Sequence, residues 1–128
     1  MECKRENIVL AVGRLEDQKG FDLLLQAWKN IENKYKDWKL CIVGKGKKET
    51  QLKALMNTLQ LQNVEFAGYK SDVDKEFRKA SVFVCSSRFE GFGMVILEAQ
   101  ANEIPVVSFD CPYGPSELIK NNETGILI

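Results

Sequence analysis

The sequence predicts a single α/β domain in which a doubly wound parallel sheet of about six strands carries helices on both faces. Short apolar runs recur at intervals of roughly 20 to 30 residues, and segments of helical periodicity lie between them. The apolar runs do not alternate with polar residues, which is typical of parallel strands buried on both faces. The length of 128 residues suits one such domain.

The first half of the chain is predicted to contain three strands separated by two helices. We expect the strands at residues 8–12, 40–43 and 64–67, because each is a short apolar run. The first helix is indicated by apolar residues at helical spacing, namely Phe21, Leu24, Leu25, Trp28, Ile31 and Tyr35. The second helix is indicated in the same way by Leu52, Leu55, Met56 and Leu59.

The second half begins with a short helix at about residues 72–78, with Val73, Phe77 and Ala80 facing inward. Ser71 and Asp74 at its start resemble a capping box. Further strands are expected at residues 81–85, 104–109 and 125–128, with helices at about 93–101 and 115–120 between them. Because the chain stops on a buried-looking strand without a closing helix, we expect it to be a fragment of a larger protein.

Composition excludes several classes of protein. Lysine plus arginine and aspartate plus glutamate number 18 each, and this zero net charge argues against a nucleic-acid binder. The absence of histidine excludes a histidine base, nucleophile or metal ligand from this chain. The four cysteines are far apart, so we expect no zinc site, and Cys41 and Cys85 in apolar runs should be buried, reduced thiols. We expect neither a secretory segment nor a membrane span, because residues 1–128 contain no secretory h-region and no apolar stretch long enough to span a bilayer.

The loops after the strands are the expected site, because ligands of doubly wound sheets bind beyond the carboxyl ends of the strands. After the first strand, Arg14 and Lys19 precede a helix N-terminus, which is an arrangement suited to binding phosphates. Two solvated surface charges explain this spacing equally well. After the second strand, Gly44 and Gly46 lack the third glycine of a dinucleotide fingerprint, so a tight turn with exposed lysines is the preferred interpretation. A nicotinamide-dependent oxidoreductase is disfavoured, because the sequence has neither a GxGxxG motif after the first strand nor an acidic residue directly after the second.

The strongest signal follows the fourth strand, where Glu90 precedes Gly91, Phe92 and Gly93, and Glu98 lies in an otherwise apolar helix. The glycines allow close approach of a ligand to the backbone, and carboxylates can accept hydrogen bonds from sugar and ribose hydroxyls. The alternative for Glu98 is a structural cap or ion pair. Tyr69 and Lys70, after the third strand, could wall a base-binding pocket.

These motifs resemble the C-terminal, donor-binding domain of the retaining GT-B glycosyltransferases of family 4, also called group 1. The resemblance covers essentially the whole chain and implies that the Rossmann-like domain is half of a GT-B fold. It is carried by Val12-Gly13-Arg14 with Lys19-Gly20, Gly44-Lys45-Gly46, Phe66-Ala67-Gly68-Tyr69, Ser87 through Gly93, the E-x7-E pair Glu90 and Glu98, and Ile104-Pro105-Val106-Val107.

The resemblance implies that the full-length enzyme transfers a sugar from a nucleotide-sugar to a glycan or lipid-linked acceptor with retention, in surface polysaccharide synthesis. UDP is the expected nucleotide on family frequency, although GDP, the sugar and the acceptor stay open. The implied catalytic residues are Arg14 and Lys19 on the diphosphate and Glu90 on the transferred sugar. The implied donor-binding residues are Gly13, Tyr69, Lys70, Gly91, Phe92, Gly93 and Glu98. The family generally needs no metal, and we expect no other cofactor.

Two departures from the family pattern qualify these expectations. Residues 110–117 replace the Gly-Gly turn that many members carry before the last helix. The chain also lacks the N-terminal acceptor domain and the closing C-terminal helix, so we expect residues 1–128 alone to be inactive. The alternative function is a non-catalytic nucleotide-binding module. We expect a cytoplasmic protein, with peripheral association of the full-length enzyme at the inner face of the membrane as an option.

Overall fold

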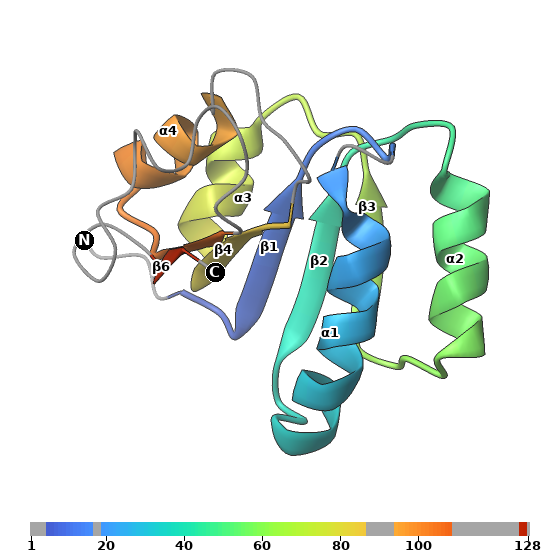
Figure 1. Ribbon diagram of the computed structural model, residues 1–128. Coiled ribbons are helices and arrows are strands. Elements are labelled where there is room, and N and C mark those ends of the chain that lie inside the picture. The colour runs from blue at the N-terminus through green and yellow to red at the C-terminus, as the bar shows by residue number, and fades with distance from the viewer. Residues whose placement is uncertain (1–4, 17–18, 87–93, 109–125, 128) are drawn as a thin grey trace.

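The strands of the computed structural model form one parallel six-stranded sheet in the order β3-β2-β1-β4-β5-β6 (Figure 1). The structure describes residues 5–16, 19–86, 94–108 and 126–127. The strands are β1 (Ile8–Val12), β2 (Lys39–Val43), β3 (Val64–Gly68), β4 (Val82–Cys85), β5 (Val106–Ser108) and β6 (Ile126–Leu127). The strand order reverses between β1 and β4, as in a doubly wound fold.

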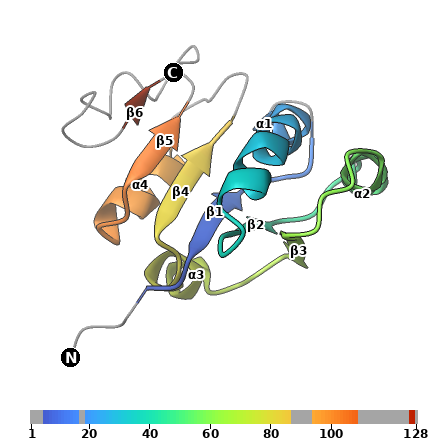
Figure 2. The same ribbon diagram turned by 90° about the horizontal axis from the view of Figure 1, so that it is seen from below.

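Helices cover both faces of this sheet, as the sequence predicts. They are α1 (Phe21–Lys34), α2 (Glu49–Thr58), α3 (Val73–Lys79) and α4 (Met94–Ala101). The helices α1 and α2 lie on one face and α3 and α4 on the other, and the view from below in Figure 2 shows the two layers on either side of the strands. The helix predicted at 115–120 lies outside the described residues. None of the helices in the described ranges is long and apolar enough to cross a membrane.

The two faces of the sheet carry separate hydrophobic cores because neighbouring strand residues point in opposite directions. Leu10 belongs to the core beneath α3 and α4, where the rings of Phe77 and Phe83 meet edge to face at 5.3 Å. The next residue, Ala11, belongs to the core beneath α1 and α2, together with the fully buried Trp28. Continuous apolar runs in the sequence therefore correspond to strands that are buried from both sides.

Two of the cysteines confirm the expectation of buried, reduced thiols. Cys41 in β2 and Cys85 in β4 are both buried, and neither forms a disulfide bond. Burial raises the pKa of Cys41 to about 11, so this thiol stays protonated at neutral pH and behaves as a small hydrophobe. Cys3 and Cys111 lie outside the described residues.

The apolar stripe predicted for α1 ends earlier than its spacing suggests. The side chains of Ile31 and Tyr35 are 40% and 58% exposed, whereas Glu32 is buried. The Glu32 carboxylate accepts hydrogen bonds from the backbone N–H of Gln62 at 3.0 Å and of Asn63 at 2.6 Å. This carboxylate thus fastens the end of α1 to the segment that enters β3, which the periodicity alone could not show.

The boundaries of two elements also differ from the prediction. The cap of α3 is Asp72, whose carboxylate accepts from the backbone N–H of Lys75 at 3.2 Å, so the capping box predicted from Ser71 is wrong. The fifth strand begins at Val106, two residues later than predicted. Pro105 has no N–H to donate to a sheet, although its carbonyl accepts from Phe83 at 2.9 Å.

Long side chains fasten the helices to one another at the amino ends of the strands. The Arg5 guanidinium donates to the carbonyls of Phe77 at 2.7 Å, Ala80 at 2.8 Å and Asn102 at 2.7 Å, which joins the C-terminal ends of α3 and α4. On the other face, the Lys29 ammonium donates to the Leu59 carbonyl beyond α2 at 2.6 Å. Cations placed at helix C-termini satisfy carbonyls that the helices leave unpaired.

Candidate functional site

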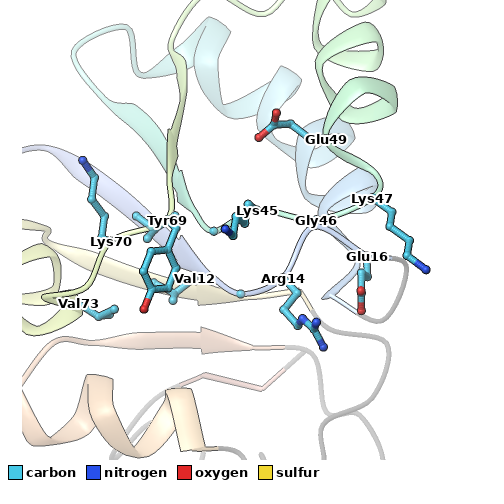
Figure 3. Close-up of a pocket in the computed structure, with 13 residues that line it drawn as sticks. Val12, Arg14, Glu16, Lys45, Gly46, Lys47, Glu49, Tyr69, Lys70 and Val73 are labelled. Atoms are coloured by element: carbon cyan, nitrogen blue, oxygen red, sulfur yellow. The ribbon is translucent and has the colours of Figure 1, made fainter.

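A cavity of about 740 Å³ lies beyond the carboxyl ends of β1, β2 and β3 (Figure 3). Three loops line it, one after each strand. They contribute Gly13 and Arg14 after β1, Lys45 and Lys47 after β2, and Tyr69 and Lys70 after β3. Four residues that the sequence singled out, namely Gly13, Arg14, Tyr69 and Lys70, are therefore brought together, although the roles assigned to them stay predictions.

The cavity combines apolar walls with a positively charged rim. Val12, Val43 and Val73 contribute apolar surface. Positive charges outnumber negative charges among the lining residues. The cationic residues are Arg14, Lys45, Lys47 and Lys70, and the carboxylates are Glu16 and Glu49. Such a site favours an anionic ligand that also carries an apolar or flat ring.

The loops after β1 and β2 are packed directly against each other. The backbone N–H of Leu15 donates to the carbonyl of Lys45 at 3.1 Å, and that of Gly44 donates to Gly68 at 2.8 Å. A Cβ atom on Gly44, whose φ is +142°, would lie 1.8 Å from the Gly13 carbonyl oxygen, and one on Gly46 would lie 2.7 Å from backbone atoms of Leu15. The two glycines thus permit close approach of two loops, which agrees with the structural interpretation of this motif.

Arg14 and Lys19 lie close to the point where the strand order reverses. The stem of Lys19 passes over Gly13, since a Cβ added there would lie 2.7 Å from the Lys19 Cε. The buried hydroxyl of Ser86, directly after β4, donates to the Lys19 carbonyl at 2.8 Å and ties the two loops together. Within the described part of the chain, the exposed Arg14 guanidinium has no ion pair or hydrogen bond. It is therefore available to an anion in this region.

Tyr69 stands at the opposite side of the cavity with most of its ring exposed. Its side chain is 69% exposed, and the Lys45 ammonium lies 5.8 Å from the ring centre. Figure 3 shows Lys45 directed toward Tyr69, whereas Lys70 points away from both. An exposed aromatic face beside a cation can accept a stacked, electron-rich ring.

The acidic part of the predicted site is only partly described. Glu90, Gly91, Phe92 and Gly93 lie outside the described residues. Glu98 lies on α4 with an exposed side chain, and the Asn102 backbone N–H and side-chain amide donate to its carbonyl oxygen at 3.2 and 2.9 Å. The proposed contact of Glu98 with ribose stays a prediction.

Sequence reasoning missed several residues that line the cavity. Lys45 and Lys47 appeared only as exposed lysines of a turn, and the carboxylates Glu16 and Glu49 were not singled out. The signal that could have found them is the position of their loops, because all loops after parallel strands meet at one edge of the sheet. Which of these residues lie next to one another, however, can be known only from the strand order.

The strand order and this cavity define a class of protein, a doubly wound α/β domain with a cation-lined ligand site at the carboxyl edge of its sheet. Within that class, the family model for glycosyl transferases group 1 matches residues 2–128, and the chain belongs to this family.

Curated relatives agree with that assignment. The chain is 39% identical over 127 residues to an uncharacterized glycosyltransferase of Haemophilus influenzae, covering 98% of this chain and 36% of that protein. It is 38% identical over 121 residues to the amylovoran biosynthesis glycosyltransferase AmsD of Erwinia amylovora, covering 94% of this chain and 34% of that protein. The chain thus spans about a third of the length of these relatives.

Solved structures show the same fold. A mutant of TarM from Staphylococcus aureus, solved with fondaparinux, α-GlcNAc-glycerol and UDP, superimposes with a TM-score of 0.93 at 32% identity. The match covers 96% of this chain and 25% of TarM. The lipopolysaccharide outer core galactosyltransferase WaaB in its apo form gives a TM-score of 0.82 at 30% identity, covering all of this chain and 37% of WaaB. The domain corresponds to the Rossmann-like half of a GT-B glycosyltransferase.

Proposed function

We propose that this chain is the donor-binding domain of a retaining, family 4 glycosyltransferase that transfers a sugar from a UDP-sugar to a glycan or lipid-linked acceptor. The observation that carries the proposal is the cation-lined cavity, which extends from Tyr69 to Arg14 near the β1–β4 reversal. Among the described residues, the Arg14 side chain has no ion pair or hydrogen bond. The name of AmsD, an amylovoran biosynthesis glycosyltransferase, supports a place in surface polysaccharide synthesis. The structure of TarM with UDP supports UDP as the nucleotide.

In this proposal, the diphosphate of the donor lies against Arg14 and Lys19, ahead of the N-terminus of α1. Transfer breaks the bond between the anomeric carbon and the phosphate oxygen, so negative charge develops on the departing nucleoside diphosphate. Two cations and a helix N-terminus stabilise that charge without a metal ion. Gly13 leaves room for the Lys19 stem to reach this position.

The remaining donor contacts follow from the family resemblance. The backbone at Tyr69 and Lys70 meets the base at the apolar end of the cavity, and Glu98 holds the ribose hydroxyls. Glu90 binds hydroxyls of the transferred sugar, with the backbone amides of Gly91, Phe92 and Gly93 nearby. The acceptor binds to a separate N-terminal domain of the whole enzyme.

Calorimetric titration of this chain with UDP, GDP, UDP-glucose and UDP-galactose tests the donor site. We expect saturable binding of UDP, weakened roughly tenfold or more in Arg14→Ala and Lys19→Ala, because each loses a charge-assisted hydrogen bond to phosphate. Lys34→Ala is the matched control, since Lys34 is exposed at the far end of α1. Saturation by no nucleotide, or equal weakening by Lys34→Ala, would contradict the proposal.

A substitution of Glu90 distinguishes between two hypotheses, a transferase and a module that binds a nucleotide without catalysis. Glu90→Ala should weaken the binding of UDP-glucose and leave the binding of UDP nearly unchanged, because only the former carries the sugar. An equal loss for both ligands would argue against a contact between Glu90 and the sugar.

A further inference from the structure

We propose that Lys45 is a specificity-determining residue of the donor site. It selects a base with an oxygen at C4 of a pyrimidine or C6 of a purine, as in uracil and guanine, over one with an amino group at that position. The inference rests on the proposed function, because it assigns the base end of the same cavity. Neither the family motifs nor the diphosphate contacts assign any role to this side chain.

The backbone that carries Lys45 is held in place by the loop after β1 and by the end of β3. Its own carbonyl accepts from Leu15 at 3.1 Å, and the preceding Gly44 donates to Gly68 at 2.8 Å. Gly44 and Gly46 also leave no room for a Cβ atom against the loop after β1. The Lys45 Cα is therefore fixed relative to all three strands that carry the cavity, and only its side chain can adapt.

The side chain of Lys45 lines the cavity, and among the described residues its ammonium has no hydrogen-bond acceptor. In the ranges that the structure describes, its polar contact is the face of the Tyr69 ring, 5.8 Å from the ring centre. This interaction is weak at an exposed site, so an oxygen of a ligand can replace it. The other lysines of the cavity are directed elsewhere, since Lys70 points away from Tyr69 and Lys47 lies at the far rim (Figure 3).

The ammonium occupies the region over Tyr69 that a stacked base would take. A base that packs on the exposed ring moves this ammonium to the edge of the base. There the substituent at C4 of a pyrimidine or C6 of a purine decides the interaction, because uracil and guanine carry an oxygen at that position while cytosine and adenine carry an amino donor. An ammonium can donate but cannot accept a hydrogen bond. It therefore binds the oxygen and leaves the amino group unpaired.

The test compares the affinities for UDP and CDP by calorimetry, in the unsubstituted chain and in Lys45→Met and Lys47→Met. GDP and ADP provide the same contrast on a purine. We expect UDP to bind roughly tenfold more tightly than CDP, as one favourable base contact predicts, and this ratio to fall to about 1–2 in Lys45→Met. Methionine keeps the unbranched shape and removes the charge. In Lys47→Met both affinities should fall equally, and the ratio should stay.

Each alternative outcome is decisive. If UDP binds and Lys45→Met keeps the ratio, the inference is wrong while the proposed function stands. Equal binding of UDP and CDP by the unsubstituted chain overturns it as well. If neither pair of nucleotides binds, the proposed function and the inference fail together. Thermal unfolding of Lys45→Met should match that of the unsubstituted chain, because the side chain is exposed, and this confirms that the variant is folded.

Discussion

The two ends of the sheet use charge in opposite ways. At the amino ends of the strands, Arg5, Lys29 and Glu32 are each bound to backbone groups of another element. At the carboxyl ends, Arg14 and Lys45 line a cavity, and in the described ranges neither side chain has an ion pair or a hydrogen bond. The difference separates charges that hold the fold together from charges that are left for a ligand.

This comparison has a physical basis. A charged side chain that is already satisfied by backbone groups gains little from a ligand, whereas its removal leaves those groups unpaired. A charge in contact with water has little effect on the free energy of unfolding, but it is available to bind an anion. Substitutions at the amino end should therefore change stability, and substitutions at the carboxyl end should change binding.

The largest effect on stability is expected from Glu32→Ala. Removing this buried carboxylate leaves the backbone N–H groups of Gln62 and Asn63 unpaired, which should lower the free energy of unfolding by about 3 kcal/mol. Urea unfolding measures the change, and Glu65→Ala, at an exposed position, is the control, with a loss below about 1 kcal/mol. An equal loss of free energy of unfolding in the two variants would mean that the buried Glu32 carboxylate stabilises the fold no more than a surface charge does.

A second comparison replaces one arginine by alanine at the amino ends of the strands and another at their carboxyl ends. Arg5→Ala should lower the free energy of unfolding by about 2 kcal/mol, because it frees carbonyls at the ends of α3 and α4. Arg14→Ala should change it by less than about 0.5 kcal/mol, since Arg14 is exposed. Denaturant unfolding of both variants in the absence of nucleotide measures the contrast. If Arg14→Ala proved the more destabilising variant, the division between the two ends would be wrong.

The smallest effect is expected from the ion pair of Lys39 and Glu65, which joins β2 and β3 at 3.0 Å. Their hydrogen bond raises the pKa of Lys39 above 10.5 and lowers that of Glu65 below 4.5. The carboxylate contribution is therefore present above pH 4.5 and lost as the pH falls through the lowered pKa. The ammonium contribution is present below pH 10.5 and lost as the pH rises through the raised pKa.

Because both side chains are exposed, this pair should stabilise the fold by at most about 0.5 kcal/mol. A double-mutant cycle with Lys39→Ala and Glu65→Ala at neutral pH measures that coupling. It should weaken as the pH falls through the lowered pKa of Glu65, and also in about 1 M salt. A coupling that persisted under both conditions would mean that the pair is shielded from solvent.

The strands of this fold could be predicted from the sequence because burial on both faces produces continuous apolar runs. The bounds of β1 match the prediction, and β3 extends it by one residue to Gly68. The fastening by Glu32 could not be predicted, because its partners lie 30 residues away and carry no local pattern. A charged residue within a helix usually indicates a solvent-facing position.

The candidate site likewise has residues that the sequence could identify and contacts that it could not. Gly13, Arg14, Tyr69 and Lys70 could be singled out because they follow strands whose carboxyl ends share one edge of the sheet. The approach of Lys45 to Tyr69 depends on β2 lying beside β3, and the packing of its loop depends on β2 lying beside β1. Such contacts follow from the strand order and not from spacing along the chain.

The packed turn at residues 44–46 constrains how this protein can diversify. Two of its three positions admit only glycine without moving the loop after β1, whereas the position between them contributes only a backbone carbonyl to the packing. Within this turn, natural selection can therefore accept substitutions at position 45 but not at the two glycines. A lineage could alter the ligand it recognises there, one side chain at a time, while the scaffold beneath stays the same.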